Sequence, residues 1–412
     1  MHARGSRAMT NGIGDTSGSA ATARRPPRLA FTRALVILSL SLAVCLQGGC
    51  RADASWPLWE SYTRNALDPQ GRIVDHSAGD RTTSEGQAYA LFFALVANDR
   101  PRFDKLLHWT QDNLADGDLT TQLPAWSWGK TPEGSWKILD QNPASDADLW
   151  VAYTLLEAGR LWHDPRYQSI GSAMAANIAQ QEVILIPSLG ATLISGPHGF
   201  HPYPDIWLLN PSYLQPSILA YFASTMPQGP WGAVLTSLHP ILSQTSGGGF
   251  AMDWVSAGPS LSPAPSPSQF ATGNPTAPAV GSYDAIRVYL WLGMADPDTP
   301  GVKESLAELS GMANYLKAHT SPPQRVDENG ALLQANPPIG FSAAVIPYLD
   351  AIGMKTQQKV QADQLAAARV PSTGLYGPQA AYYDQNLALF ATGWAEHRFH
   401  FDRDGTLKVK WR

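Results

Sequence analysis

The sequence predicts an all-α protein in which six helical hairpins close into a ring. Twelve stretches carry apolar residues three and four positions apart, which is the spacing of a helix with one buried face. Strand patterns are few and short. A closed ring of six hairpins leaves no hairpin face exposed. An open solenoid of stacked hairpins is the alternative, but no constant repeat length favours it.

The helical spacing is clearest near the start of the predicted domain. Leu91, Phe92 and Leu95 follow it in one stretch, and Phe103 and Leu106 follow it in the next. The same criterion places the twelve expected helices at residues 56–67, 83–97, 101–114, 148–163, 165–183, 211–225, 231–245, 283–295, 301–319, 340–353, 356–370 and 382–398.

Strand patterns occur at three places. They are residues 182–186, the stretch around 207–209, and the tail from 399 to 411. Residues 256–282 are rich in Ser, Pro, Ala and Gly. Because proline lacks an N–H donor and fixes its own backbone, we expect this stretch to form neither a helix nor a core strand. It is predicted to be a long exposed loop inside the domain.

Residues 1–54 are predicted to be a signal peptide with an N-terminal extension. Four arginines between positions 24 and 33 precede an apolar run over residues 34–46, which is too short to span a bilayer. Ala52 and Ala54 form a small-x-small cleavage pattern, so the mature chain is expected to begin near Ser55, as one domain in the periplasm or outside the cell. Lipid attachment at Cys50 is an alternative, since the residues before it partly resemble a lipobox.

Charge and cysteine content limit the possible functions. The net charge is −5, charged residues make up 15% of the chain, and no basic block follows the N-terminus, which argues against nucleic-acid binding.

The only cysteines, Cys45 and Cys50, lie in or beside the signal segment. The exported domain must therefore be stable without a disulfide. The 14 Trp, 14 Tyr and 12 Phe exceed the needs of a core and are typical of a sugar-stacking cleft, although core packing accounts for many of them.

Three acidic sites are expected at helix N-termini. Ser84 and Gln87 have capping-box spacing, which places Glu85 in a first turn. Asp146 and Asp148 open another predicted helix. A third is expected to be capped by Ser282, with Asp284 in its first turn. A ring of antiparallel helix pairs collects the N-termini of its inner helices at one rim, so these carboxyl groups can meet in one cleft.

An acid in a first turn also stabilises a helix by about 0.3–1 kcal/mol, so none of these residues alone identifies a site. The surrounding motifs are more specific. They are TSEGQAY at 83–89, ASDADLWVAY at 144–153 with its continuation to 162, and YDAIR at 283–287. In this order they resemble glycoside hydrolase family 8, and the resemblance extends from Trp56 to Trp394.

The resemblance implies an (α/α)6 barrel, an endo-1,4-β-glucanase (cellulase) with a long open cleft, inversion at the anomeric carbon, and neither a metal nor a cofactor. It implies that Glu85 is the general acid, Asp284 the general base, and Asp146 the residue that holds the central sugar in a distorted ring. Asp148 is the alternative for that last role. The implied partners are a cellulose chain and a cellulose-synthesising assembly, with the enzyme itself a monomer.

Aromatic and basic residues are expected to complete the cleft. Trp126, Trp128 and Trp136 lie in a Gly-, Pro- and Thr-rich segment without apolar periodicity, so they are interpreted as loop residues that stack on sugars. The candidate sugar contacts, by their positions in the matching motifs, are Tyr213, Tyr283, Arg287 and Tyr383.

Two His-x-x-His pairs, at 198–201 and 397–400, lack a third ligand at metalloprotease spacing and do not predict a metal site.

The expected mechanism contains one electrostatic conflict. A helix N-terminus lowers the pKa of Glu85, whereas a general acid must keep its proton. Burial beneath aromatic rings and the charge of Asp146 are the expected opposing effects. Xylan, lichenan and chitosan remain alternative substrates. A glucan-binding subunit without turnover is the rival from another class, and the presence of all three carboxyl groups argues against it.

Overall fold

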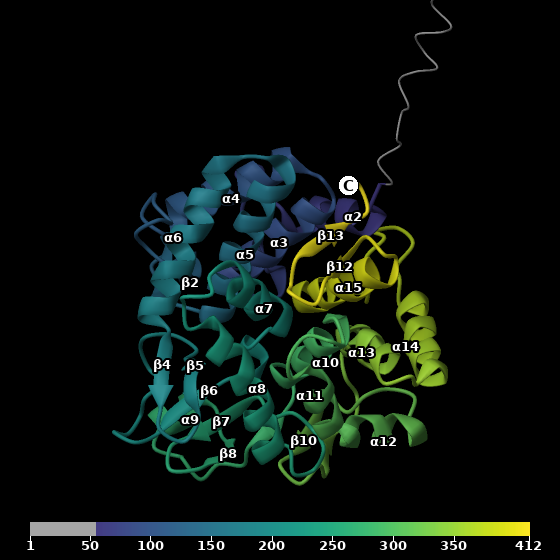
Figure 1. Ribbon diagram of the computed structural model, residues 1–412. Helices are drawn as coiled ribbons and strands as arrows, with labels where there is room; N and C mark the ends of the chain where they lie inside the picture. Colours follow the sequence, from purple (N-terminus) through teal and green to yellow (C-terminus); the bar gives the residue numbers. More distant parts are fainter. Residues whose placement is uncertain (1–54) are drawn as a thin grey trace, which may run out of the picture. The chain divides into compact units, whose positions relative to one another are not determined.

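Six helices with almost wholly buried side chains form the inner wall of a closed ring (Figure 1). Each contacts the next in the chain, and the last contacts the first, so the ring is complete and the open solenoid is excluded. These inner helices are α3 (Ser84–Val96), α5 (Ser145–Trp162), α7 (Pro216–Thr225), α10 (Ala285–Met294), α13 (Ile339–Ala351) and α15 (Tyr382–Ala395).

An outer layer of helices pairs with the inner ring. It consists of α4 (Arg100–Leu114), α6 (Pro165–Gln181), α8 (Trp231–Thr245), α11 (Val302–Glu308) with α12 (Ser310–Ala318), α14 (Lys355–Ala367) and α2 (Pro57–Ala66). The contacting pairs are α3 with α4, α5 with α6, α7 with α8, α10 with α11, α13 with α14, and α15 with α2. The last hairpin joins the two ends of the domain. The predicted (α/α)6 barrel is therefore confirmed.

This computed structural model describes residues 55–412, which form one unit by themselves. The expected signal segment, the cleavage pattern and Cys50 lie outside the described residues and stay predictions. Within the described part, no helix combines the length and the apolar character needed to cross a membrane.

Aromatic rings fill the centre of the barrel. Phe390 of α15 lies 5.0 Å, between ring centroids, from Tyr89 of α3, from Trp150 of α5 and from Trp291 of α10. Phe92 lies 4.9 Å from Trp150. Each of these rings belongs to an inner helix, so side chains from four hairpins converge on one cluster. Part of the high aromatic content is thus core, as the sequence allowed.

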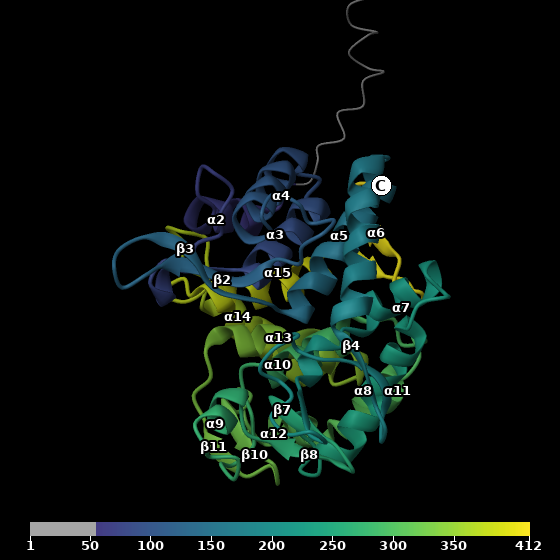
Figure 2. The same ribbon diagram turned by 90° about the vertical axis from the view of Figure 1, so that its left-hand side faces the viewer.

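Short antiparallel strands occupy the loops, and the three expected strand regions are confirmed. The sheets are β1 (Thr82–Thr83) with β2 (Ala125–Lys130) and β3 (Trp136–Pro143); β4 (Val183–Ile186) with β5 (Gly190–Leu193); β6 (Trp207–Leu209) with β7 (Trp254–Ala257) and β8 (Leu261–Ala264); β9 (Val280–Gly281) with β10 (Arg325–Asp327) and β11 (Leu332–Gln334); and β12 (Phe399–Phe401) with β13 (Leu407–Val409). In Figure 2 the β2–β3 hairpin projects from the side of the ring that carries α3 and α4.

Two expected helices are interrupted. The stretch 211–225 contains a 3-10 turn at Pro211–Tyr213, and α7 begins only at Pro216. Proline disfavours a helical conformation in the residue before it and is well suited to a first helical position. The stretch 301–319 breaks at Leu309 between α11 and α12. There the backbone N–H of Gly311 donates to the carbonyl of Gly249.

The expectation that residues 256–282 contain no helix or strand was wrong. Strand β8 pairs with β7, and its Leu261 and Ala264 are buried. Pro263 is tolerated because β8 is the edge strand of its sheet. A short helix, α9 (Pro267–Ala271), follows, with a capping box at its start. The prolines therefore mark an edge strand and a helix start as well as turns.

Candidate active site

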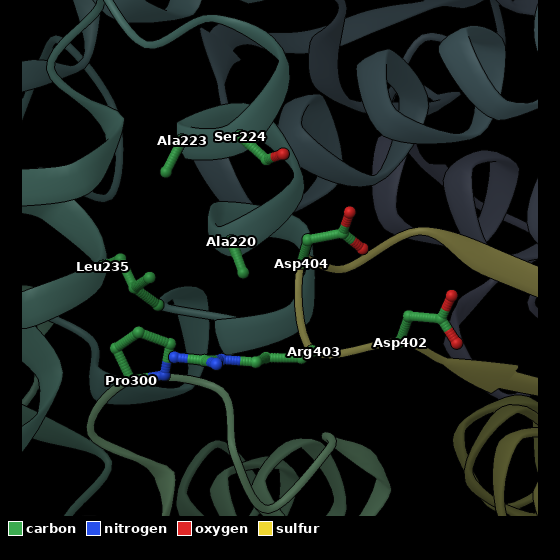
Figure 3. A pocket seen from close by; sticks show the side chains of 8 residues that line it. All are labelled: Ala220, Ala223, Ser224, Leu235, Pro300, Asp402, Arg403 and Asp404. Carbon is green, nitrogen blue, oxygen red and sulfur yellow. The ribbon is translucent and has the colours of Figure 1, made fainter.

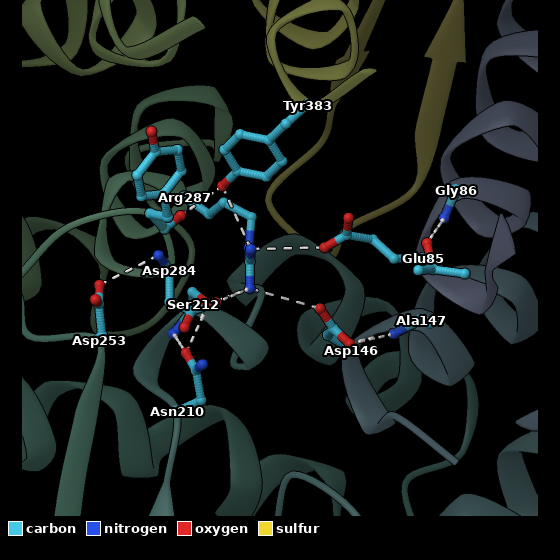
Figure 4. A network of polar contacts seen from close by, with 12 residues as sticks. Glu85, Gly86, Asp146, Ala147, Asn210, Ser212, Asp253, Asp284, Arg287 and Tyr383 are labelled. Atoms are coloured by element: carbon cyan, nitrogen blue, oxygen red, sulfur yellow. Dashed lines mark hydrogen bonds and ion pairs between the residues drawn. The ribbon is translucent and has the colours of Figure 1, made fainter. Parts of the chain in front are cut away.

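Three carboxyl groups from separate inner helices meet at one guanidinium (Figure 4). The Nη2 atom of Arg287 lies 2.9 Å from Asp284 Oδ1 and 3.7 Å from Asp146 Oδ2, and its Nη1 atom lies 3.5 Å from Glu85 Oε2. Glu85 and Asp146 stand in the first turns of α3 and α5, and Asp284 immediately precedes α10. The predicted meeting of these acids at one rim is confirmed. We call Glu85, Asp146 and Asp284 the carboxylate cluster.

Arg287 is the buried cation that holds this cluster together. Only 5% of its side chain is exposed. It also donates to Ser212 Oγ at 2.9 Å and to the Tyr383 hydroxyl at 3.3 Å. The guanidinium has five N–H donors in a rigid plane, so it can bind several acceptors at once. One positive charge among three carboxyl groups cannot neutralise all of them, so protonation of part of the cluster is favoured.

The segment before α3 fixes the position of Glu85 differently from the expected capping box. Thr83, and not Ser84, caps the helix, with its Oγ1 accepting from the N–H of Gly86 at 3.1 Å. Gln87 points inward, where it accepts from a backbone N–H and donates to a backbone carbonyl before α3. A Cβ at Gly86 would lie 2.5 Å from the Tyr382 hydroxyl, so glycine is required for this close approach.

The electrostatic conflict predicted for Glu85 is resolved in favour of a proton donor. Burial raises the pKa of the Glu85 carboxyl, and the charge of Asp284 adds to this effect. The Arg287 guanidinium is the main opposing influence. Burial was the expected cause of the raised pKa and is the largest one. The charge that adds to it is that of Asp284, whereas Asp146 was expected in this role. A raised pKa favours the protonated form, which a general acid requires.

Asp146 and Asp284 differ in their exposure. The Asp146 side chain is 7% exposed, whereas that of Asp284 is 29% exposed. Burial raises the pKa of Asp146 to about 7, with Arg287 opposing the shift and Glu85 adding to it. Asp284 is the more open carboxylate and makes the shorter ion pair with Arg287. The Glu85 side chain is 20% exposed, so Asp284 is the carboxyl group of the three that water reaches most easily.

The start of α10 was predicted incorrectly. Ser282 does not cap the helix, because its hydroxyl donates to the Gln324 carbonyl at 2.8 Å. The N–H groups that open the helix donate instead to Asp253, which no sequence motif indicates. Burial raises the pKa of Asp253 to about 7, and the charge of Asp284 adds to that shift.

The tyrosines of the matching motifs surround Arg287. The Tyr383 hydroxyl donates to the Tyr283 carbonyl at 2.5 Å, and their rings lie 6.0 Å apart. Tyr283 is 46% exposed, so its ring is open to solvent beside Asp284. The Arg287 guanidinium lies 5.9 Å from the Tyr213 ring centre. These three tyrosines therefore line the carboxylate cluster, as their positions in the motifs predicted.

The predicted tryptophan loop is a β-hairpin beside Glu85. Trp126 and Trp128 lie on β2 and Trp136 on β3, so the expectation of a loop was wrong. Trp128 and Trp136 stack at 5.2 Å with an interplanar angle of 21°. Thr83, the cap of α3, pairs with β2 at Ser127, which connects this tryptophan hairpin directly to the start of α3.

Residues that the sequence did not indicate support the tryptophan hairpin. The Arg72 guanidinium lies 5.0 Å from the Trp128 ring centre and 4.9 Å from that of Trp136. Trp109 packs its ring edge-to-face against Trp128 at 5.4 Å. Trp136 is still 43% exposed. One rigid aromatic surface thus remains open to a ligand.

Asp148 is removed from the candidate sugar contacts. Its side chain is fully buried and faces Glu182 at the end of α6, which is also fully buried. Burial raises the pKa of both carboxyl groups well above the usual range, and their proximity raises that of Asp148 further. No other donor within residues 55–412 reaches these oxygens, so the pair requires a shared proton. The cleft-facing acid of this motif is Asp146.

This buried pair makes stability depend on pH. Both pKa values are higher in the folded than in the unfolded chain, so the folded state binds more protons and stability falls as pH rises above about 4 towards the folded pKa values. Glu182→Gln cannot lose a proton. We expect it to increase the unfolding free energy at pH 8 by about 1–3 kcal/mol and to change it little at pH 5. Urea unfolding at both pH values measures this, with the exposed Glu304→Gln as a control that leaves the pH dependence unchanged.

Other features of the described domain do not form a competing site. A pocket of about 480 Å³ lies between α7, α8 and the β12–β13 turn (Figure 3), and it shares no residue with the carboxylate cluster. Its lining residues are Ala220, Ala223, Ser224, Leu235, Pro300, Asp402, Arg403 and Asp404. Over residues 55–412, no group of three or more His, Cys, Asp or Glu side chains is placed to hold a metal ion.

The fold and the carboxylate cluster define an acid–base hydrolase. Glu85, whose pKa is raised and whose side chain is 20% exposed, lies across Arg287 from Asp284, which is 29% exposed. The tryptophan hairpin pairs with the segment that caps the helix of Glu85. Paired carboxyl groups with opposite protonation states are the arrangement that cleaves glycosidic bonds. Residues 33–397 match the family described as glycosyl hydrolases family 8, and the chain belongs to that family. It is a glycoside hydrolase.

Similar proteins cover most of the chain. An endoglucanase of Xanthomonas axonopodis pv. citri (strain 306) is 44% identical over 87% of this chain and 90% of that protein. An endoglucanase of Escherichia coli (strain K12) is 39% identical over 92% of this chain and 96% of that protein. The crystal structure of an endo-1,4-D-glucanase from Vibrio fischeri ES114 is 36% identical, with a TM-score of 0.75 over 87% of this chain and 99% of that one.

Proposed function

We propose that this glycoside hydrolase is an endo-acting β-1,4-glucanase, a cellulase that cuts internal bonds of a glucan chain with inversion. The observation that carries the proposal is the pairing of Glu85, whose pKa is raised, with the more open Asp284 at one guanidinium. The relatives named endoglucanase support glucan as the substrate.

In the proposed reaction, Glu85 donates its proton to the glycosidic oxygen of the leaving sugar. Asp284 removes a proton from a water molecule that attacks the anomeric carbon from the opposite face. The ion pair with Arg287 holds the Asp284 carboxyl group in position. An inverting pair requires about 6.5–9.5 Å between the two carboxyl groups, a separation that stays a prediction.

Asp146 and the aromatic side chains are proposed to bind the substrate. Asp146 lies between the acid and base at Arg287, where a carboxyl can accept a hydroxyl hydrogen bond from the central sugar. Trp136 and Tyr283 present exposed rings beside the acid and the base, respectively. Flat rings bind the apolar faces of sugars while leaving their hydroxyl groups in water.

The substrate is tested by parallel incubation with carboxymethyl-cellulose, lichenan, xylan and chitosan, with product lengths followed over time. We expect cleavage of carboxymethyl-cellulose to short oligosaccharides with an early fall in viscosity, which indicates internal cuts. Faster cleavage of xylan or chitosan would mean that the proposed substrate is wrong. Binding to glucan without any cleavage would mean that the protein is a glucan-binding subunit and not an enzyme.

The stereochemistry of the first product tests the roles of the two carboxyl groups. Single displacement by water gives the α-anomer from a β-1,4-glucan. If Asp284 were a nucleophile, a glycosyl-enzyme would form and the first product would be the β-anomer. Proton NMR within minutes of adding the enzyme separates these outcomes before mutarotation mixes the anomers. We expect the α-anomer.

The place of action is proposed from the N-terminal residues alone. The basic stretch, the apolar run and the small-x-small pattern support export with cleavage near Ser55, into the periplasm or beyond. We also propose that the enzyme acts beside a cellulose-synthesising assembly and that it is a monomer. Both proposals rest on the resemblance to the family. Cell fractionation with N-terminal sequencing tests the export, because a chain that still carries Met1 outside the cytoplasm contradicts the cleavage.

A further inference from the structure

The helix that carries the base region is capped by a residue from a distant segment. The Oδ1 atom of Asp253 accepts from the backbone N–H groups of Ser282 at 2.8 Å, Asp284 at 3.2 Å and Ala285 at 2.8 Å. Asp253 itself is held by its own N–H, which donates to the Val280 carbonyl at 2.8 Å. The contact between Asp253 and Asp284 is visible in Figure 4.

Asp284 lies inside the first turn of the helix, because its backbone is helical and the Ile286 N–H already donates to the Ser282 carbonyl at 3.0 Å. The N–H groups of Asp284 and Ala285 are therefore among the first-turn donors that lack a partner within the helix. The Asp284 side chain makes no capping hydrogen bond. Its carboxylate points to Arg287 instead, and Asp253 takes the N–H groups.

The two segments approach so closely that their relative position is fixed. A Cβ at Gly281 would lie 2.2 Å from the Ala251 carbonyl oxygen, which no side chain permits. Gly281 also pairs with Val326 between β9 and β10. The Asp253 acceptor is therefore held by backbone on both sides of its contact with α10.

We propose that Asp253 is a positioning residue for the catalytic base. By accepting from the N–H groups of Ser282, Asp284 and Ala285, it fixes the backbone from which the Asp284 carboxylate reaches Arg287. This inference rests on the proposed function of Asp284. It concerns the conformation of the base and assigns no contact between Asp253 and the substrate.

Three substitutions separate positioning from charge. Asp253→Ala removes the acceptor, so the backbone at Ser282, Asp284 and Ala285 loses its anchor and the Asp284 carboxylate is displaced. We expect kcat to fall about 100-fold with KM on cello-oligosaccharides nearly unchanged, since a small displacement of a reacting group has an effect of this size. Asp253→Asn retains Oδ1 and should keep kcat within about threefold of the parent, because an amide oxygen also caps helices well. Asp253→Glu retains the charge but displaces the acceptor, and it should lose kcat as Ala does.

Asp164→Ala is the matched control. Asp164 caps the outer helix α6 by accepting from the N–H of Arg166 at 3.0 Å, and it makes no contact with the carboxylate cluster. We expect it to lower the melting temperature and leave kcat unchanged. If Asp253→Ala does not fold, Asp253→Glu and Asp253→Asn still give opposite expected results.

The outcomes also separate this inference from the proposed function. Parental kcat in Asp253→Ala or Asp253→Glu, with Asp284→Asn inactive, overturns the positioning role alone. Equal loss in Asp253→Asn and Asp253→Ala overturns it as well, because the charge and not the acceptor then matters. Normal turnover by Asp284→Asn removes the base assignment itself, whatever the Asp253 variants do.

Discussion

Glu85→Gln and Asp284→Asn are each expected to lower kcat on cello-oligosaccharides by about 10²–10⁴-fold. Each change removes a proton-transfer group while keeping the shape of the side chain, so folding and KM should change little. Both groups lie at Arg287, and neither belongs to the aromatic surfaces proposed to bind the sugar. Steady-state kinetics with a melting curve for each variant measure the effect. Glu304→Gln, an exposed acid on α11, is the control expected to behave as the parent.

The two variants should differ with an activated substrate. A dinitrophenyl leaving group needs no proton, so its glycoside should restore much of the bond cleavage in Glu85→Gln and none in Asp284→Asn. Because burial raises the pKa of Glu85, the parent rate should fall as pH rises through that pKa and the acid loses its proton. Glu85→Gln has no proton to lose and should lack this fall. Normal turnover of cello-oligosaccharides by either variant would contradict its assigned role.

The barrel could be predicted because its inner helices are apolar in a regular pattern. Helix α3 is buried along almost its whole length, and the outer helices α4 and α6 bury only one face each. Such patterns are local, so the sequence reveals them. The acids of the carboxylate cluster could be found for a related reason, since each stands within a short motif at a helix start.

Side chains that act through distant partners could not be predicted. Asp253 lies in an irregular stretch before β7, and its capping role depends on backbone some thirty positions later. Asp148 stands two residues from Asp146, yet it is buried because Glu182 of another helix end faces it. Arg72 likewise has no motif and gains its role only by contact with the tryptophan hairpin. Long-range contacts of this kind leave no periodic signal along the chain.

The tryptophan hairpin illustrates a different limit. Trp126 and Trp128 alternate with Ser127 and Gly129 on β2, which is the two-residue period of a strand. The prolines, threonines and glycines around them nevertheless favoured a loop. Pairing of β2 with the Thr83 segment stabilises the hairpin, and that partner lies more than forty residues earlier. The predicted loop was therefore wrong, and the stacking of these tryptophans on sugars stays a prediction.

Arg287→Met is expected to have the largest effect on stability. The substitution keeps much of the side-chain volume but removes the buried charge that faces Glu85, Asp146 and Asp284. Breaking a buried ion pair by removing one partner costs about 3–5 kcal/mol, because the remaining charges stay buried without compensation. Activity should be lost too, since the carboxylate cluster has no other shared contact. By contrast, Arg166→Met removes an exposed partner of Asp164 and should cost about 0–1 kcal/mol.

The pH dependence of this loss identifies its cause. Without Arg287 the pKa values of Glu85 and Asp146 rise further in the folded state, which then binds more protons than the unfolded state above about pH 4. Stability must therefore fall as pH rises, and the deficit of Arg287→Met should be larger at pH 8 than at pH 5. Arg287→Lys keeps a charge but lacks the planar fork, so it should recover part of the stability and little of kcat. Urea unfolding at the two pH values measures the difference. An equal deficit at both would mean that Arg287 stabilises the domain through packing, and the electrostatic account of the cluster would be wrong.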